Sequence, residues 1–124
     1  SNNNLSLFGE MKTTAIVQKN AYHTPAAFSA EQIWQFATDN AYRAFGMNNG
    51  IFAGANADLA LIDLKKPWFV PQSSILSHLV YSMAGGVDTT IVNGRVLMQN
   101  GIIPGEEEIL EKAQECFLRL TSED

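Results

Sequence analysis

Apolar residues recur every three to four positions in the first part of the chain, which is the spacing of an α-helix. Residues 5–19 form the first such segment, and Asn4 stands at the position of its N-cap. The shared face consists of Phe8, Met11 and Ala15, with Ile16 beside them. We therefore predict a helix over residues 5–19 that buries this face.

Residues 28–45 carry the most complete set of helix signals in the sequence. Ser29 and Gln32 have the spacing of a capping box, in which each side chain accepts a hydrogen bond from the other residue's backbone. Phe28 precedes the cap, where a hydrophobic staple packs against Ile33. We predict one continuous helix over this segment.

The end of this helix and its buried stripe also follow from the sequence. Gly46 is placed to end the helix in a left-handed conformation. Trp34 and Phe36 lie off the centre of the stripe, which indicates burial on more than one side; core packing is favoured over a ligand-stacking role. The predicted stripe is Ile33, Ala37, Ala41, Ala44 and Phe45.

The pattern then changes to short apolar runs separated by turn residues. Residues 57–63 have the length and composition of a strand that is buried on both faces. Residues 87–92 and 95–99 flank Asn93-Gly94, a pair that tolerates positive φ and is the strongest short-range signal of a β-hairpin. We therefore predict a sheet built around this hairpin.

Two further helices complete the pattern. Ser73 or Ser74 can cap a helix over about 74–84, whose apolar face is Ile75, Leu76, Leu79, Val80 and Met83. Glu106, Glu107 and Glu108 favour the positive end of a last helix within residues 104–124. Its predicted buried stripe is Ile109, Ala113, Cys116, Phe117 and Leu120.

Composition narrows the classes of protein. A chain of 124 residues is one domain or a piece of one, and its 46% hydrophobic content is enough for a core. No apolar run approaches the roughly 18 residues of a membrane span. The net charge of −5 and the scattered Lys and Arg residues argue against a nucleic-acid partner. The single cysteine, Cys116, indicates a reducing cytoplasm.

Local chemistry alone does not reveal a function. His23 and His78 belong to no metal-binding motif, so a structural role is favoured for each. Cys116 lies on the predicted buried stripe, where an inert core thiol is expected. Asp58 and Asp63 flank one strand at a spacing that points them to opposite faces, which disfavours joint acid and base catalysis.

Three phrases in order give the chain a family resemblance. Residues 1–12, 50–63 and 87–98 read SNNNLSLFGEMK, GIFAGANADLALID and VDTTIVNGRVLM. Together they resemble the C-terminal third of the amidohydrolase superfamily, in the branch of methylthioadenosine/S-adenosylhomocysteine deaminases, guanine deaminases and chlorohydrolases.

The resemblance implies a mixed α/β fold, in which the chain supplies the last helices of a metal-dependent (β/α)₈ barrel and the C-terminal strands of a composite β-sandwich. Residues 1–47 would be the terminal barrel helices. Residues 48–103 would be the sandwich strands, with the inserted helix at about 74–84, and residues 104–124 the C-terminal helix.

The resemblance also implies a chemistry. In this family a zinc or iron ion activates a water, which attacks the ring carbon of a nitrogen heterocycle and displaces an amine or a chloride. The ligands are a His-x-His pair, two further histidines and an aspartate, and none is present in this chain. No catalytic residue and no metal ligand is therefore expected here. Ser1 and Asn2 would lie near the substrate, on the loop after the eighth strand.

Three hypotheses for the function follow. In the first, the chain is the C-terminal fragment of a deaminating or dechlorinating hydrolase and is inactive by itself, with the rest of the barrel as its partner. In the second, it is a free-standing structural or interaction module that associates with itself through exposed strand edges. In the third, it is a subunit that complements a separately encoded barrel.

Overall fold

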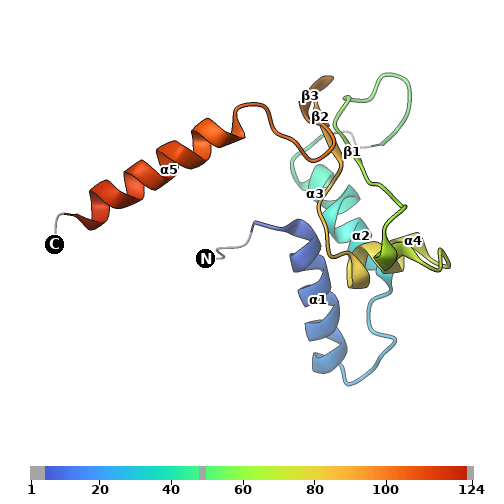
Figure 1. The fold of residues 1–124 in the computed structure, drawn as a ribbon. Coiled ribbons are helices and arrows are strands. Elements are labelled where there is room, and N and C mark those ends of the chain that lie inside the picture. The colour runs from blue at the N-terminus through green and yellow to red at the C-terminus, as the bar shows by residue number, and fades with distance from the viewer. Residues whose placement is uncertain (1–4, 48–49, 123–124) are drawn as a thin grey trace. The chain divides into compact units, whose positions relative to one another are not determined.

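The computed structural model describes residues 5–47 and 50–122 (Figure 1). The chain divides into two compact units. The first comprises Ser1–Asn56 and Asp63–Gly86, and the second comprises Ala57–Ile62 and Val87–Asp124. The first unit is helical, and the second holds a small antiparallel sheet and the last helix. This is the mixed α/β composition that the sequence predicts.

The first helix, α1, runs over Leu7–Ala21. Its N-cap is Ser6, whose Oγ accepts a hydrogen bond from the N–H of Gly9 at 3.2 Å. The predicted start at Leu5 was therefore wrong by two residues, and Asn4 lies outside the described residues. Met11 and Ala15 are buried as predicted, but Ile16 is 52% exposed, because consecutive residues of a helix point in directions roughly 100° apart.

The predicted second helix is present as two pieces, α2 (Ala30–Ala37) and α3 (Asp39–Ala44). The capping box at Ser29 and Gln32 is confirmed in both of its hydrogen bonds, of 2.9 and 3.3 Å. A single continuous helix was wrong. Thr38 leaves the helical conformation, with φ −119° and ψ −89°, and its Oγ1 donates to the carbonyl of Trp34 at 2.8 Å. A threonine hydroxyl that bonds the backbone four residues back competes with the helix in this way.

The break at Thr38 also changes which side chains are buried. Ile33 is 1% exposed, but Phe45 at the far end of the predicted stripe is 79% exposed, and Ala44 is exposed as well. The stripe assumed unbroken helical periodicity, and residues after the break no longer continue it. Gly46 adopts φ +66°, as the predicted helix stop requires.

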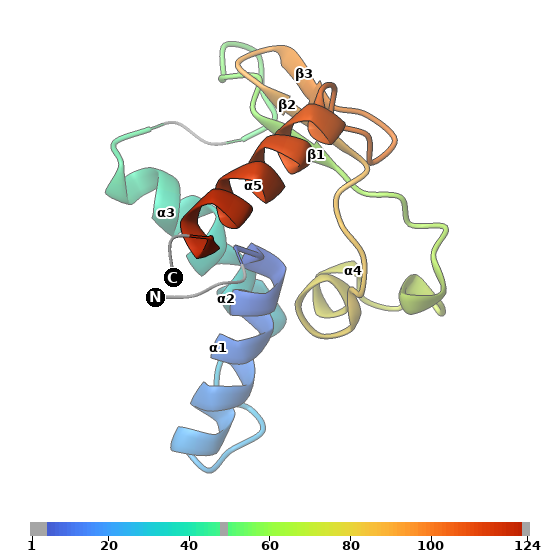
Figure 2. The ribbon, with the colours of Figure 1, turned by 60° about the vertical axis from the view of Figure 1, so that its left-hand side comes forward.

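The core of the first unit consists of Met11, Ala15, Ile33 and Val80. The helix α1 packs against α2 and against the segment that contains Val80 (Figure 2). Phe8, Phe28, Ala30, Trp34, Ala37 and Tyr81 are partly buried and pack around this core. Trp34 thus packs against the core, as the sequence favours, whereas Phe36 is 44% exposed and its predicted burial was wrong.

The predicted helix over about 74–84 begins as a single α-helical turn and continues as a π-helical turn. Ser74 is the N-cap of α4 (Ile75–Ser77), and residues His78–Ser82 are π-helical. Leu79 and Val80 are buried as predicted. Before it, Pro67–Phe69 forms a 3₁₀ turn that buries Phe69.

The sheet of the second unit has the order β1-β2-β3, with both pairs antiparallel. Its strands are β1 (Leu59–Leu61), β2 (Thr89–Val92) and β3 (Arg95–Met98). The hairpin is confirmed, because Asn93 and Gly94 adopt φ +49° and +73° between paired strands.

Burial of β1 on both faces was wrong. Leu59 is half-buried, whereas Ala60 and Leu61 are exposed. The strand is three residues long and pairs with β2 along one edge only. An apolar run indicates that a strand can be buried. Whether it is buried depends on whether other elements cover its faces.

The last helix, α5, runs over Glu106–Thr121 with three glutamates in its first turn. The helix is confirmed, but its predicted buried stripe was wrong: Ile109, Phe117 and Leu120 are 61%, 57% and 73% exposed. Helical spacing determines which side chains share a face. It does not determine what covers that face.

Candidate functional site

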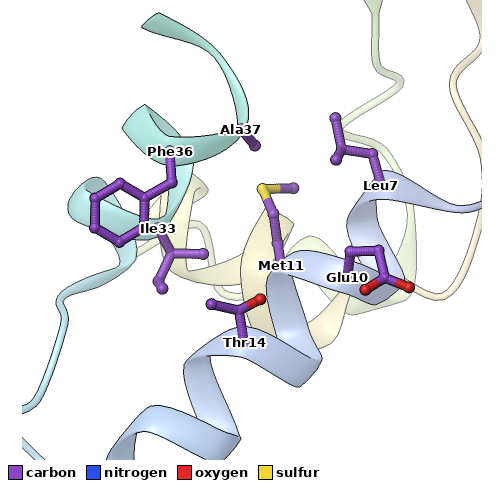
Figure 3. A pocket seen from close by; sticks show the side chains of 7 residues that line it. All are labelled: Leu7, Glu10, Met11, Thr14, Ile33, Phe36 and Ala37. Carbon is purple, nitrogen blue, oxygen red and sulfur yellow. The ribbon is translucent and has the colours of Figure 1, made fainter. Parts of the chain in front are cut away.

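The first unit contains an open hollow between α1 and α2 (Figure 3). Its volume is about 390 Å³, including the space open to solvent. The lining comes from one side of each helix: Leu7, Glu10, Met11 and Thr14 from α1, and Ile33, Phe36 and Ala37 from α2. Helical spacing explains this set, because residues three and four apart lie one above another on the same face.

The hollow is an open edge of the core. Met11 and Ile33 belong both to its lining and to the core cluster, and they are 4% and 1% exposed. Leu7 and Phe36 form half-exposed walls, at 55% and 44%. Figure 3 places Leu7 and Ala37 on either side of the Met11 thioether. The hollow therefore suits apolar groups.

The hollow has little chemistry of its own. Glu10 is the one charged residue in the lining, and Figure 3 shows its carboxylate pointing away from the α2 side chains. Thr14 adds a hydroxyl. General acid–base catalysis needs titratable groups positioned around a reacting atom, and this lining supplies a single carboxylate at its edge. A binding role fits it better than catalysis.

One of the two histidines, His78, has the structural character that the sequence favours. His78 lies in the π-helical turn, where its Nε2 is 2.9 Å from the carbonyl oxygen of Pro71 and its ring meets Phe69 edge-on at 6.2 Å. His23 lies exposed in the connector after α1, at φ +50°. Among the described residues, neither histidine joins a group of side chains that could hold a metal ion.

A metal centre does not fit the part of the chain that the structure describes. No three His, Cys, Asp or Glu side chains in residues 5–47 and 50–122 converge in a way that could hold a metal ion. The imidazole of His78 is already paired with a carbonyl oxygen. The described residues thus provide no donor set for the zinc or iron that the family resemblance implies.

Asp58 and Asp63 have separate partners. Asp58 accepts a hydrogen bond from the N–H of Asn93 at 2.6 Å. Asp63 accepts one from the N–H of Lys65 at 2.9 Å and pairs with the Lys66 ammonium at 3.3 Å. The Lys65 N–H is the main reason that the pKa of Asp63 lies below its usual value, and Lys66 adds to it. Each carboxylate holds a turn, and the two do not act jointly.

Cys116 is exposed on α5, so the expectation of a core thiol was wrong. Its Sγ lies 4.0 Å from the guanidinium of Arg119, one helical turn away. Cys116 lies on the apolar side of α5, as the helical spacing predicts. That side is exposed, so the thiol is exposed as well.

Ser1 and Asn2, which the sequence suggests for substrate binding, lie outside the described residues. The sequence pattern did not predict the α1–α2 hollow. A signal for it existed: Leu7, Met11 and Thr14 repeat at helical spacing, and Ile33 and Ala37 do so on the next helix. The spacing of these residues does not indicate whether the two helices pack closely together or leave a hollow between them.

Comparison with known proteins identifies the family. Residues 1–97 match the amidohydrolase family over more than half of the chain. The chain belongs to the amidohydrolase family, as its three phrases suggest.

Two relatives with the names of adenosine-derivative deaminases are similar to this chain. Over all 124 residues the chain is 54% identical to a 5′-deoxyadenosine deaminase of Methanothrix thermoacetophila, and it covers 30% of that protein. It is 43% identical to 5-methylthioadenosine/S-adenosylhomocysteine deaminase 1 of Archaeoglobus fulgidus, with 98% of this chain and 30% of that protein aligned. The chain thus spans about a third of the length of these relatives.

A solved structure agrees with this assignment. The crystal structure of an adenosine deaminase from Xanthomonas campestris with bound zinc matches 98% of this chain with a TM-score of 0.89 and 27% identity. The match covers 29% of that chain.

None of the described helices is long and apolar enough to cross a bilayer.

Proposed function

We propose that this chain is the C-terminal part of a deaminase that acts on the adenine ring of an adenosine derivative. The observation that carries the proposal is the 54% identity to a 5′-deoxyadenosine deaminase along the full 124 residues. The chain covers only 30% of that relative, so the activity belongs to a larger assembly of which this chain is one part.

The reaction exchanges one ring substituent. Water supplies a hydroxyl group to the ring carbon that bears the amine, the carbon–nitrogen bond breaks, and ammonia leaves with the remaining proton. We choose deamination over dechlorination because the relatives are named as deaminases of adenosine derivatives. A 5′-deoxy or 5′-thioether nucleoside is the substrate class that these names support.

We assign this chain a structural role within that enzyme. The helices α1, α2 and α3 would be the last helices of the barrel, and β1, β2 and β3 would belong to the composite sandwich. The metal would be held by the remaining part, since this sequence has two histidines and no His-x-His pair. The zinc in the Xanthomonas campestris structure supports zinc as that metal. The isolated chain is therefore not a catalyst in this proposal.

A chimera tests the proposal. The matching 30% of the Methanothrix enzyme is replaced by this chain, and ammonia release is measured with 5′-deoxyadenosine, 5′-methylthioadenosine and a chlorinated heterocycle. We expect zinc-dependent deamination of the nucleosides and no reaction of the isolated chain. A folded, zinc-loaded chimera that deaminates neither nucleoside would contradict the proposal.

The same chimera tests the substrate-binding site predicted at Ser1 and Asn2, through a substitution of Asn2. We propose that they lie beside the substrate, so that Asn2→Ala lowers kcat/KM at least about tenfold, the loss expected when a polar substrate contact is removed. Asn20→Ala is the control, because Asn20 is an exposed residue at the end of α1. Equal kcat/KM values for the two variants would remove Asn2 from the site.

The free-standing module is kept as a second candidate because of the exposed apolar side chains along the sheet. Val96 of the edge strand β3 is 54% exposed, and Leu61 of the edge strand β1 is 47% exposed. Edge strands of this kind pair with other strands. Light scattering on the isolated chain distinguishes the free-standing module from the deaminase part, since self-association into a defined dimer favours the module.

A further inference from the structure

The hollow between α1 and α2 is an apolar surface that nothing in the chain's described first unit fills. Its floor is the well-packed core pair Met11 and Ile33, whereas its walls Leu7 and Phe36 remain half-exposed. A core normally ends in a polar rim, and an apolar hollow that opens directly from a core is typical of a contact surface.

We infer that the α1–α2 hollow seats apolar side chains of the remaining, larger part of the amidohydrolase fold. This inference rests on the proposed function. Two observations support this occupant: the hollow is continuous with the core, and about 70% of the length of the relatives lies outside the region matched by this chain. The lining, with one carboxylate at its edge, favours aliphatic or aromatic side chains over a charged ligand.

Cysteine footprinting reads this contact directly. Leu7→Cys and Phe36→Cys place a thiol on each wall of the hollow, and labelling by a soluble thiol reagent is quantified at each site by peptide mass spectrometry. Each variant is prepared in the isolated chain and in the chimera with the Methanothrix enzyme. Lys12→Cys is the matched control, because Lys12 is an exposed charged residue on the same helix.

We expect the thiols of Leu7→Cys and Phe36→Cys to react readily in the isolated chain and at least about tenfold more slowly in the chimera, where labelling requires local opening. The Lys12→Cys thiol should react at a similar rate in both. Equal rates for the wall positions in the two proteins would overturn the inference. So would protection that appears in the isolated chain as its concentration rises, since a second copy would then fill the hollow.

The outcome is separable from that of the proposed function. An active chimera whose wall thiols stay reactive would overturn the assignment of the hollow and leave the deaminase intact. Protected wall thiols in an inactive chimera would support the assignment of the hollow and contradict the deaminase proposal. A chimera that fails to melt cooperatively would overturn the inference as well, because the surface of this chain would then not fit the remainder of a close relative.

Discussion

The Oδ1 atom of Asp58 accepts a hydrogen bond from the backbone N–H of Asn93 at 2.6 Å, across 35 residues of sequence. The next N–H, that of Gly94, donates to the carbonyl of Ala57 at 3.0 Å. The residues before β1 therefore hold the tip of the β2–β3 hairpin, and Asp58 has a structural role in the second unit.

Removal of the Asp58 carboxylate should loosen this tip. Asp58→Ala leaves the Asn93 N–H without its partner and is expected to cost about 1 kcal/mol of local stability, so that the Asn93 amide exchanges about fivefold faster. Asp58→Asn keeps an acceptor oxygen and should have a smaller effect. Unchanged exchange in the alanine variant would show that the bond contributes nothing in solution.

Gly94→Ala tests the backbone of the same hairpin. Gly94 has φ +73°, and an added Cβ would meet only the Ala57 Cβ at 4.0 Å, so the cost is strain rather than a clash. We expect a loss of roughly 1 kcal/mol in urea unfolding followed by NMR signals of the sheet. Gly86→Ala is the control, because Gly86 has open space and no left-handed φ. Equal losses at both positions would argue against the strain.

Asp63 should titrate below the value of an unfolded aspartate, about 3.9. Because its folded pKa is lowered, its contribution to stability is present above the unfolded pKa and is lost as the pH falls through the folded pKa. Lys66→Ala should raise the pKa only slightly, since the Lys65 N–H is the main cause. Carboxyl chemical shifts measured against pH report both values. A return to the unfolded pKa in Lys66→Ala would assign the shift to the ion pair instead.

Cys116 should react with a thiol reagent in the native isolated chain. The side chain is exposed on α5, so the rate is expected to lie within about tenfold of the rate in urea. A thiol that reacts only after unfolding would show that α5 buries its apolar side in solution, as the sequence alone suggested. The chain has one cysteine, so no other site contributes to the signal.

The sequence predicted the elements that depend on near neighbours. The Ser29–Gln32 capping box, the stop at Gly46 and the Asn93-Gly94 hairpin are each set by residues within a few positions of one another, and each is confirmed. The family assignment from three phrases is confirmed too. Local hydrogen bonds and φ preferences involve residues only a few positions apart, and a sequence pattern shows directly which residues are that close.

The candidate site could be predicted only in its parts. Leu7, Met11 and Thr14 stand at helical spacing, and so do Ile33 and Ala37, so the sequence indicates two apolar faces. It does not indicate that they meet with a hollow left between them, because that depends on how α1 and α2 pack.

By itself, the sequence determined the family, the Ser29–Gln32 capping box, the hairpin and the order of helices and strands. Tertiary structure decided that Cys116 is exposed and that the core opens beside Met11. The physical reason is the range of the forces. Hydrogen bonds of caps and turns are local, whereas burial depends on which surfaces are available to cover an apolar face.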